Sequence, residues 1–232
     1  MPKDTIAGVD RRQFLQAAIA GVAAGVVAPA APWWSAARGL TTRAALTPDE
    51  ALQELMAGNR RYAASRPSAM DQDMALLRKR TAEKQEPFAA VLACADSRVP
   101  VELVFDQSIG QIFVARVAGN IVTPEVMASL EYAVAALGIR AMLVLGHTNC
   151  GAVKSAMKTD VVPGQISSLY SRIQPAVDQS AGNVGRAIEV NARMQAELLR
   201  TSSTVIRQAI AARTLKVTSG IYDLSTGKVA VS

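Results

Sequence analysis

The side chains best suited to metal or acid–base chemistry stand in two short segments of this chain. “VLACADSRV” holds Cys94, Asp96 and Arg98, and “LVLGHTNCGAV” holds His147 and Cys150. The 232 residues contain no other cysteine or histidine. His147 and Cys150 are three residues apart, so one turn of the chain can direct both side chains at one ion. Two thiolates and an imidazole form a donor set that suits tetrahedral zinc.

The size of this donor set indicates what kind of metal site it would form. Three protein ligands leave the fourth position open, as in catalytic zinc sites, and no further cysteine or histidine remains to close it. Asp96 is near enough to Cys94 to be a fourth ligand or to contact metal-bound water, and Arg98 can pair with Asp96. Two alternatives remain open, a disulfide between Cys94 and Cys150 and an ordinary surface ion pair.

The segments around these residues predict where they lie in the fold. “FAAVLAC”, “QIFVARV” and “IRAMLVLGH” are apolar runs typical of buried strands, and the first and third lead into the two candidate segments. Helices and strands in succession favour an α/β fold, a central mostly parallel β-sheet flanked by helices. Because ligands bind at the carboxyl ends of parallel strands, both segments are expected to face one pocket.

Local signals predict the remaining elements. Thr47 is expected to cap a helix that has Pro48 at its first position and Glu50 in a capping box. “VPVELVFDQSIG” is expected to hold a short helix and a turn, and “LKVTSGIYDLSTGKVAVS” a strand, a turn and a final strand. Further helices are predicted at about 71–84, at 123–138 and at 184–213, the last broken near “TSST”.

Composition places these elements in one globular domain, residues 39–232. Half of the residues are hydrophobic and 19% are charged, which suits a single domain with a sizeable core. The net charge is +6, but lysine and arginine form no run and do not alternate with aromatic residues. We therefore expect no nucleic-acid partner.

Residues 1–38 resemble an export signal of the twin-arginine type. Arg11 and Arg12 precede Phe14, Leu15 and a weakly apolar stretch of alanine, glycine and valine. That stretch is short for a membrane span, although an uncleaved anchor is the alternative. The pattern predicts recognition by the export machinery and localisation to the bacterial periplasm.

Taken together, “CADSR” and “HTNCG” resemble the motifs of the beta-class carbonic anhydrases. “RVAGN” and “SLEYA” extend the similarity, with Val117 standing where many members have asparagine. The resemblance implies an obligate dimer as building block, a homodimer or tetramer, and Zn²⁺ bound by Cys94, His147 and Cys150. It also implies an Asp96–Arg98 dyad, with Asp96 as a possible fourth ligand in a closed state.

The same resemblance implies an activity and further site residues. Zinc-bound hydroxide would hydrate carbon dioxide reversibly to bicarbonate and a proton. Four more positions match substrate-binding residues of the family, namely Gln85, Phe113, Tyr132 and Gly151, although core packing is an equal alternative for the two aromatic residues. With no second histidine, proton release is expected to depend on buffer, Tyr132 or an acidic residue.

Two further functions remain compatible with the sequence. One is hydrolysis of carbonyl sulfide or carbon disulfide on the same site. The other, from a different class, is an exported non-catalytic interaction protein that contains the disulfide.

Overall fold

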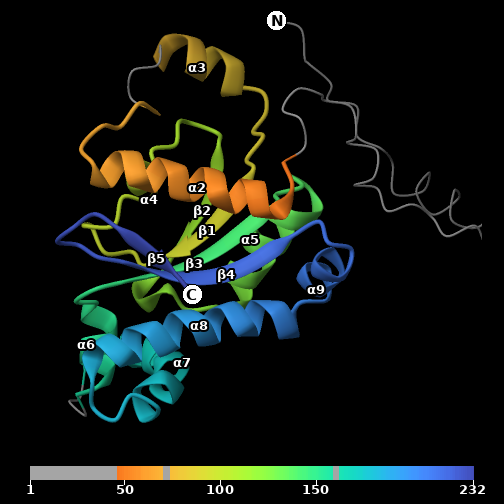
Figure 1. Cartoon of the computed structure of the whole chain (residues 1–232). Helices are drawn as coiled ribbons and strands as arrows, with labels where there is room; N and C mark the ends of the chain where they lie inside the picture. The colour runs from red at the N-terminus through yellow and green to blue at the C-terminus, as the bar shows by residue number, and fades with distance from the viewer. Residues whose placement is uncertain (1–45, 70–73, 159–161) are drawn as a thin grey trace, which may run out of the picture. The chain divides into compact units, whose positions relative to one another are not determined.

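A mostly parallel five-stranded sheet, in the order β2-β1-β3-β4-β5, forms the centre of the structure (Figure 1). This computed structural model describes residues 46–69, 74–158 and 162–232, all within the unit Leu40–Ser232. β1 pairs in parallel with β2 and β3, β3 pairs in parallel with β4, and β5 runs antiparallel to β4. The strands are β1 (Ala89–Ala93), β2 (Ile112–Arg116), β3 (Ala141–His147), β4 (Lys216–Tyr222) and β5 (Val229–Val231).

Helices cover both faces of this sheet. The helices are α2 (Pro48–Ala63), α3 (Met74–Thr81), α4 (Val101–Val104), α5 (Pro124–Ala135), α6 (Gly151–Ala156), α7 (Ser167–Asp178), α8 (Val184–Ser202) and α9 (Thr204–Ala211), with a 3-10 turn η3 (Ala118–Asn120). α2 and α4 pack on one face, and α5, α8 and α9 pack on the other. The predicted α/β fold with flanking helices is therefore confirmed.

Because helices cover both faces of the sheet, the sequences of its central strands are continuous apolar runs. Every residue of β1 and of β3 is buried. Ala89, Val91 and Ala93 contribute to the core beneath α2, whereas Ala90 and Leu92 contribute to the core beneath α5 and α8. Because alternate side chains point to opposite faces, both sets must be apolar.

Most of the local predictions are confirmed, with a few shifted boundaries. The Thr47–Glu50 capping box is present at the start of α2. α5 ends three residues before Gly138, whose φ of 68° belongs to the following turn. The break near “TSST” lies at Ser203, whose side chain caps α9. The helix predicted at 71–84 is α3, and residues 70–73 lie outside the described part.

Two helices were not predicted. α6 is only six residues long, and α7 carries Pro175 in its interior. A short helix gives too few apolar positions for a periodic pattern, and an internal proline is normally a helix-breaking signal.

The order of the strands determines where a ligand can bind. From β1 the chain moves to β2 on one side and then returns to place β3 on the other side of β1. The connections therefore diverge at the carboxyl ends of β1 and β3, which is the usual ligand position in open parallel sheets.

None of the helices in the described part of the chain is long and apolar enough to cross a membrane. The predicted signal segment, residues 1–38, lies outside the described residues.

Candidate active site

Cys94, His147 and Cys150 form one buried cluster at the carboxyl ends of β1 and β3. Their potential ligand atoms all lie within 4.8 Å of one another. Cys94 directly follows β1, His147 ends β3, and Cys150 is the N-cap of α6. Between the last two, Asn149 adopts a φ of 63°, a left-handed conformation that asparagine tolerates better than most residues. This turn brings Cys150 back beside His147.

His147 presents one ring nitrogen that has no hydrogen-bond partner. Its Nδ1 lies 3.0 Å from the carbonyl oxygen of Thr148. A carbonyl can only accept, so Nδ1 carries the proton and Nε2 keeps its lone pair. Nε2 is buried without a hydrogen bond among the described residues. A buried, unpartnered nitrogen beside two sulfur atoms fits a metal ligand.

The two cysteines are free and buried, which counts against the disulfide alternative. A hydrogen bond from Cys150 lowers the pKa of Cys94 to about 4, outweighing desolvation, with smaller contributions from His147 and from the Gly119 amide. The same hydrogen bond, together with burial, raises the pKa of Cys150. The Cys94 thiolate is therefore stabilised beside the Cys150 thiol, and a metal cation held by both sulfur atoms would displace the remaining proton.

Asp96 stands beside this cluster, held by Arg98. Its Oδ1 accepts hydrogen bonds from the Arg98 backbone N–H and Nε, both at 2.9 Å, and its Oδ2 accepts one from Nη2 at 2.7 Å. These bonds hold the pKa of Asp96 well below its usual range. Oδ2 also lies 3.8 Å from Nε2 of His147. Asp96 is therefore an ionised acceptor directed toward the side of the imidazole that is free to bind a metal.

Two further contacts shape the loop after β1, and they come from residues without a predicted site role. Arg116, the last residue of β2, donates from Nε to the carbonyl of Cys94 at 3.0 Å and from Nη2 to that of Asp96 at 2.6 Å. The Gly119 amide donates to Cys94 Sγ at 3.3 Å. The last residue of β2 thus holds the backbone of the first candidate segment, and the η3 turn that follows β2 holds its sulfur.

The candidate substrate residues lie in different places. Gly151 is the first residue of α6, directly after Cys150. Phe113 pairs in register with Ala90, four residues before Cys94, a rise of about 13 Å along the strand. Its ring contacts that of Tyr132 on α5, with centroids 6.5 Å apart.

Gln85 is exposed before the amino end of β1, whereas Cys94 follows the carboxyl end. Among the described residues, no hydrogen bond joins Gln85 to the cluster. Tyr132 is 50% exposed. Within one chain, then, the structure unites the three candidate ligands with Asp96, Arg98 and Gly151, but leaves Gln85, Phe113 and Tyr132 elsewhere.

Comparison with known proteins gives this cluster a context. A family model described as carbonic anhydrase matches residues 89–229. Carbonic anhydrase of Mycolicibacterium smegmatis is 35% identical over 191 residues, covering 78% of this chain and 92% of that protein. Carbonic anhydrase 2 of Mycobacterium tuberculosis is 34% identical over 189 residues, with 78% and 91% covered.

Solved structures agree with the sequence relatives. Coccomyxa beta-carbonic anhydrase in complex with acetazolamide superposes with a TM-score of 0.61 at 28% identity, covering 78% of this chain and 85% of that one. A tetrameric beta-carbonic anhydrase of Sordaria macrospora has a TM-score of 0.63 at 24% identity, with 78% and 95% covered, a likeness of fold. The chain belongs to the carbonic anhydrase family of enzymes, and its fold is that of the beta class.

Proposed function

We propose that this protein catalyses the reversible hydration of carbon dioxide to bicarbonate and a proton, using zinc held by Cys94, His147 and Cys150. The observation that carries the proposal is the buried cluster of these three side chains, with Nε2 of His147 left unpartnered. It occurs in a chain of the carbonic anhydrase family, at the sheet position where α/β folds bind ligands.

The donor set supports zinc in particular. Two sulfur atoms and one imidazole nitrogen suit its tetrahedral preference, and three protein ligands leave a position for water or substrate. A zinc ion held by these three side chains would supply Lewis acidity, which lowers the pKa of bound water toward 7 and would make a nucleophile available near neutral pH.

Asp96 and Arg98 then orient the reacting water. An ionised carboxylate can only accept hydrogen bonds, and Asp96 is kept ionised by Arg98. Because Oδ2 faces Nε2 of His147, Asp96 can accept a hydrogen bond from water in the open position. Arg98 uses three donors to hold the carboxylate in this orientation.

A second histidine cannot carry the released proton away from the site. The chain contains one histidine, and that residue is committed to the cluster. External buffer, Tyr132 or an acidic side chain must take the proton. We therefore expect the turnover rate at high pH to rise with buffer concentration, and a rate independent of buffer would contradict this route.

We also propose that the active protein is a homo-oligomer built from dimers. Phe113 and Tyr132 lie on the edge strand β2 and on α5, and Gln85 lies before the amino end of β1. Phe113 is near the amino end of β2, Gln85 precedes β1 and Tyr132 lies beside Phe113, whereas the cluster is at the carboxyl ends of the strands. A second copy of the chain can bring these side chains to the cluster. Tyr132 is half-exposed on α5 and its ring contacts Phe113 of the edge strand, an exposed aromatic side chain of the kind that favours such an interface.

Export to the periplasm is a separate proposal, which rests on the paired Arg11 and Arg12 before a weakly apolar stretch. Replacing both arginines by lysine should keep the full chain in the cytoplasm of a bacterial host. Arg43→Lys, outside the signal pattern, is the matched control and should be exported normally. Equal periplasmic yields from all three chains would contradict the proposal.

Stopped-flow hydration of carbon dioxide from pH 6.5 to 9 tests the catalytic proposal. The zinc-loaded protein should show a rate that rises through this range, and chelation should abolish it. Carbonyl sulfide and carbon disulfide serve as comparison substrates. Turnover of these sulfur compounds without carbon dioxide hydration would overturn the proposed substrate while leaving the metal site standing.

A further inference from the structure

Two buried amides on α8 are joined through the backbone to the sulfur of Cys94. Asn191 and Gln195 lie one helical turn apart and are only 1% and 4% exposed. Nδ2 of Asn191 donates to the carbonyl of Gly119 at 2.8 Å. The amide of the same glycine donates to Cys94 Sγ. α8 is therefore linked to the cluster of candidate metal ligands by two consecutive hydrogen bonds.

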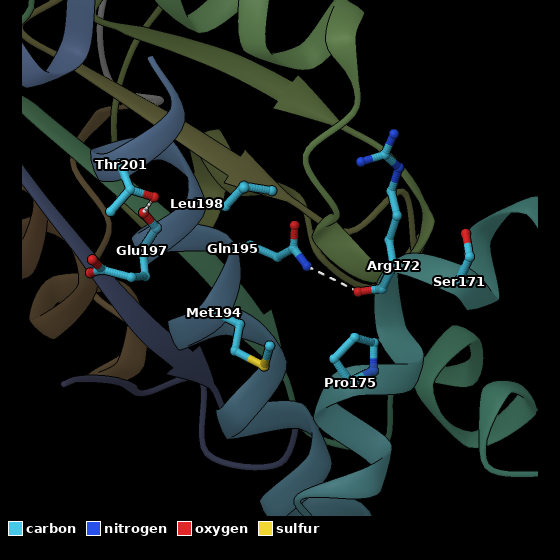
Figure 2. Close-up of a pocket in the computed structure, with 8 residues that line it drawn as sticks. All are labelled: Ser171, Arg172, Pro175, Met194, Gln195, Glu197, Leu198 and Thr201. Atoms are coloured by element: carbon cyan, nitrogen blue, oxygen red, sulfur yellow. Dashed lines mark hydrogen bonds between the residues drawn. The ribbon is translucent and has the colours of Figure 1, made fainter. Parts of the chain in front are cut away.

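Gln195 holds the other end of the same loop. Its Oε1 accepts a hydrogen bond from the Val122 amide at 2.8 Å, while Nε2 donates to the Arg172 carbonyl at 3.3 Å and to Asn191 Oδ1 at 3.4 Å. Figure 2 shows Gln195 on α8 directed toward the backbone of Arg172 on α7, in a groove of about 430 Å³. Nη1 of Arg172 donates in turn to the Val122 carbonyl at 2.9 Å.

The loop needs such support because its backbone is unusual. Gly119 and Asn120 have φ angles of 76° and 45°, two successive residues in the left-handed region. Asparagine adopts this region only at a cost, so surrounding contacts must maintain it. A side chain at residue 119 would be strained by this positive φ, and its Cβ would lie 2.8 Å from Cδ1 of Ile173, which would have to shift. The direction of the Gly119 amide is thus fixed from outside the loop.

We infer that Asn191 and Gln195 are positioning residues, which hold the Gly119 amide on Cys94 Sγ and thereby set the charge that this thiolate donates to the metal. This inference rests on the proposed metal site. Hydrogen bonds to a ligand atom tune both the affinity and the electronic properties of a bound metal. Each side-chain oxygen and nitrogen of these two buried amides has a hydrogen-bond partner, and such a network is rigid enough to hold this geometry.

A matched control is available elsewhere in the fold. Asn59 on α2 is also buried, at 2% exposed, and it also holds backbone groups: it donates to the carbonyls of Val104 and Gly227 and accepts from the Val229 amide. None of these groups contacts Cys94, His147 or Cys150. Asn191→Ala and Asn59→Ala therefore remove equivalent structural support, and only the first releases the loop that bonds Cys94.

Cobalt substitution of the full-length protein separates the two effects. Asn191→Ala should weaken cobalt affinity by about tenfold and shift the thiolate-to-cobalt charge-transfer band. Asn59→Ala should lower the unfolding temperature of the metal-free protein but leave affinity and band as in the wild type. Unchanged affinity and band in Asn191→Ala, or equal changes in Asn59→Ala, would overturn the inference.

Two further measurements keep the test decisive if Asn191→Ala does not fold. Gln195→Met conserves volume while removing the acceptor for Val122, and it should shift the cobalt band in the same direction. In the cadmium-113-loaded wild type, the Gly119 amide proton should show scalar coupling to cadmium through the hydrogen bond to sulfur, and its absence would overturn the inference. A wild type without any thiolate-to-cobalt band would instead overturn the metal site itself.

Discussion

Arg98 holds both carboxylate oxygens of Asp96 while one of them, Oδ2, lies 3.8 Å from Nε2 of His147. The same oxygen thus accepts a hydrogen bond from the guanidinium that orients it and also faces the space next to a candidate metal ligand. The negative charge of Asp96 is therefore available beside the cluster, while both of its carboxylate oxygens accept hydrogen bonds from Arg98.

Arg98→Lys should lower kcat/KM for carbon dioxide hydration by about 10- to 100-fold, with zinc content unchanged. A lysine ammonium keeps the charge but cannot present the planar set of donors that holds both oxygens. Stopped-flow kinetics with elemental analysis checks both quantities. Arg200→Lys is the control, since Arg200 pairs with exposed Glu197 on α8. Wild-type activity in Arg98→Lys would contradict the role given to this dyad.

A mixing experiment tests whether Gln85 serves the cluster of a second chain. Cys94→Ser and Gln85→Ala chains should each be impaired alone. When the two chains are co-expressed, each mixed dimer has one site in which both residues are intact. Random pairing makes about half of the dimers mixed, so about a quarter of wild-type activity is expected. Activity no higher than the mean of the separate variants would mean that Gln85 acts within its own chain or not at all.

The sequence predicted the centre of this fold well because the central strands are buried on both faces. β1 and β3 must then be apolar at every position, and their carboxyl ends must carry whatever binds at the sheet edge. That reasoning predicts that Cys94 and His147 lie close together. It does not predict the hydrogen bond between Asn191 and Gly119, 72 residues earlier, because nothing in either segment indicates a buried side-chain-to-backbone contact.

The positions of Gln85 and Phe113 illustrate a different limit. A motif spacing identifies a residue type but does not say which copy of the chain uses it. Within one chain, the register of β1 with β2 places Phe113 beside Ala90 rather than Cys94.

Asp106→Asn should cost about 2 kcal/mol of unfolding free energy at pH 7. Burial raises the pKa of Asp106. Hydrogen bonds from Arg61 and from the Ala69 and Ser68 amides lower it by a larger amount, so the net pKa is depressed. A depressed pKa stabilises the fold above the unfolded value near 4, and this stabilisation disappears as pH falls through the folded value.

Urea unfolding at pH 7 and at about pH 3.5 measures this difference between wild type and Asp106→Asn, which should shrink in acid. Asp49→Asn, in an exposed pair with Lys216, should change stability by less than about 0.5 kcal/mol at either pH. A difference for Asp106→Asn that grows in acid would contradict the assignment of a stabilising carboxylate.

Gly58→Ala should destabilise the protein by about 2–3 kcal/mol, more than the gain in helix propensity. A Cβ at Gly58 would lie 1.7 Å from the Phe105 carbonyl oxygen, so α2 would have to move away from the end of α4. Gly151→Ala is the control, because no atom lies within 4 Å of its added Cβ. Equal unfolding temperatures for the two variants would contradict this close approach.

The most direct test of the central claim is the zinc content of the wild type and of Cys150→Ser, each purified as the full chain. Elemental analysis should find about one zinc per chain in the wild type and less than about a tenth of that in the variant, whose hydroxyl is a poor substitute for a thiolate. A wild type that binds no zinc, or a variant that retains it fully, would contradict a metal site made by Cys94, His147 and Cys150.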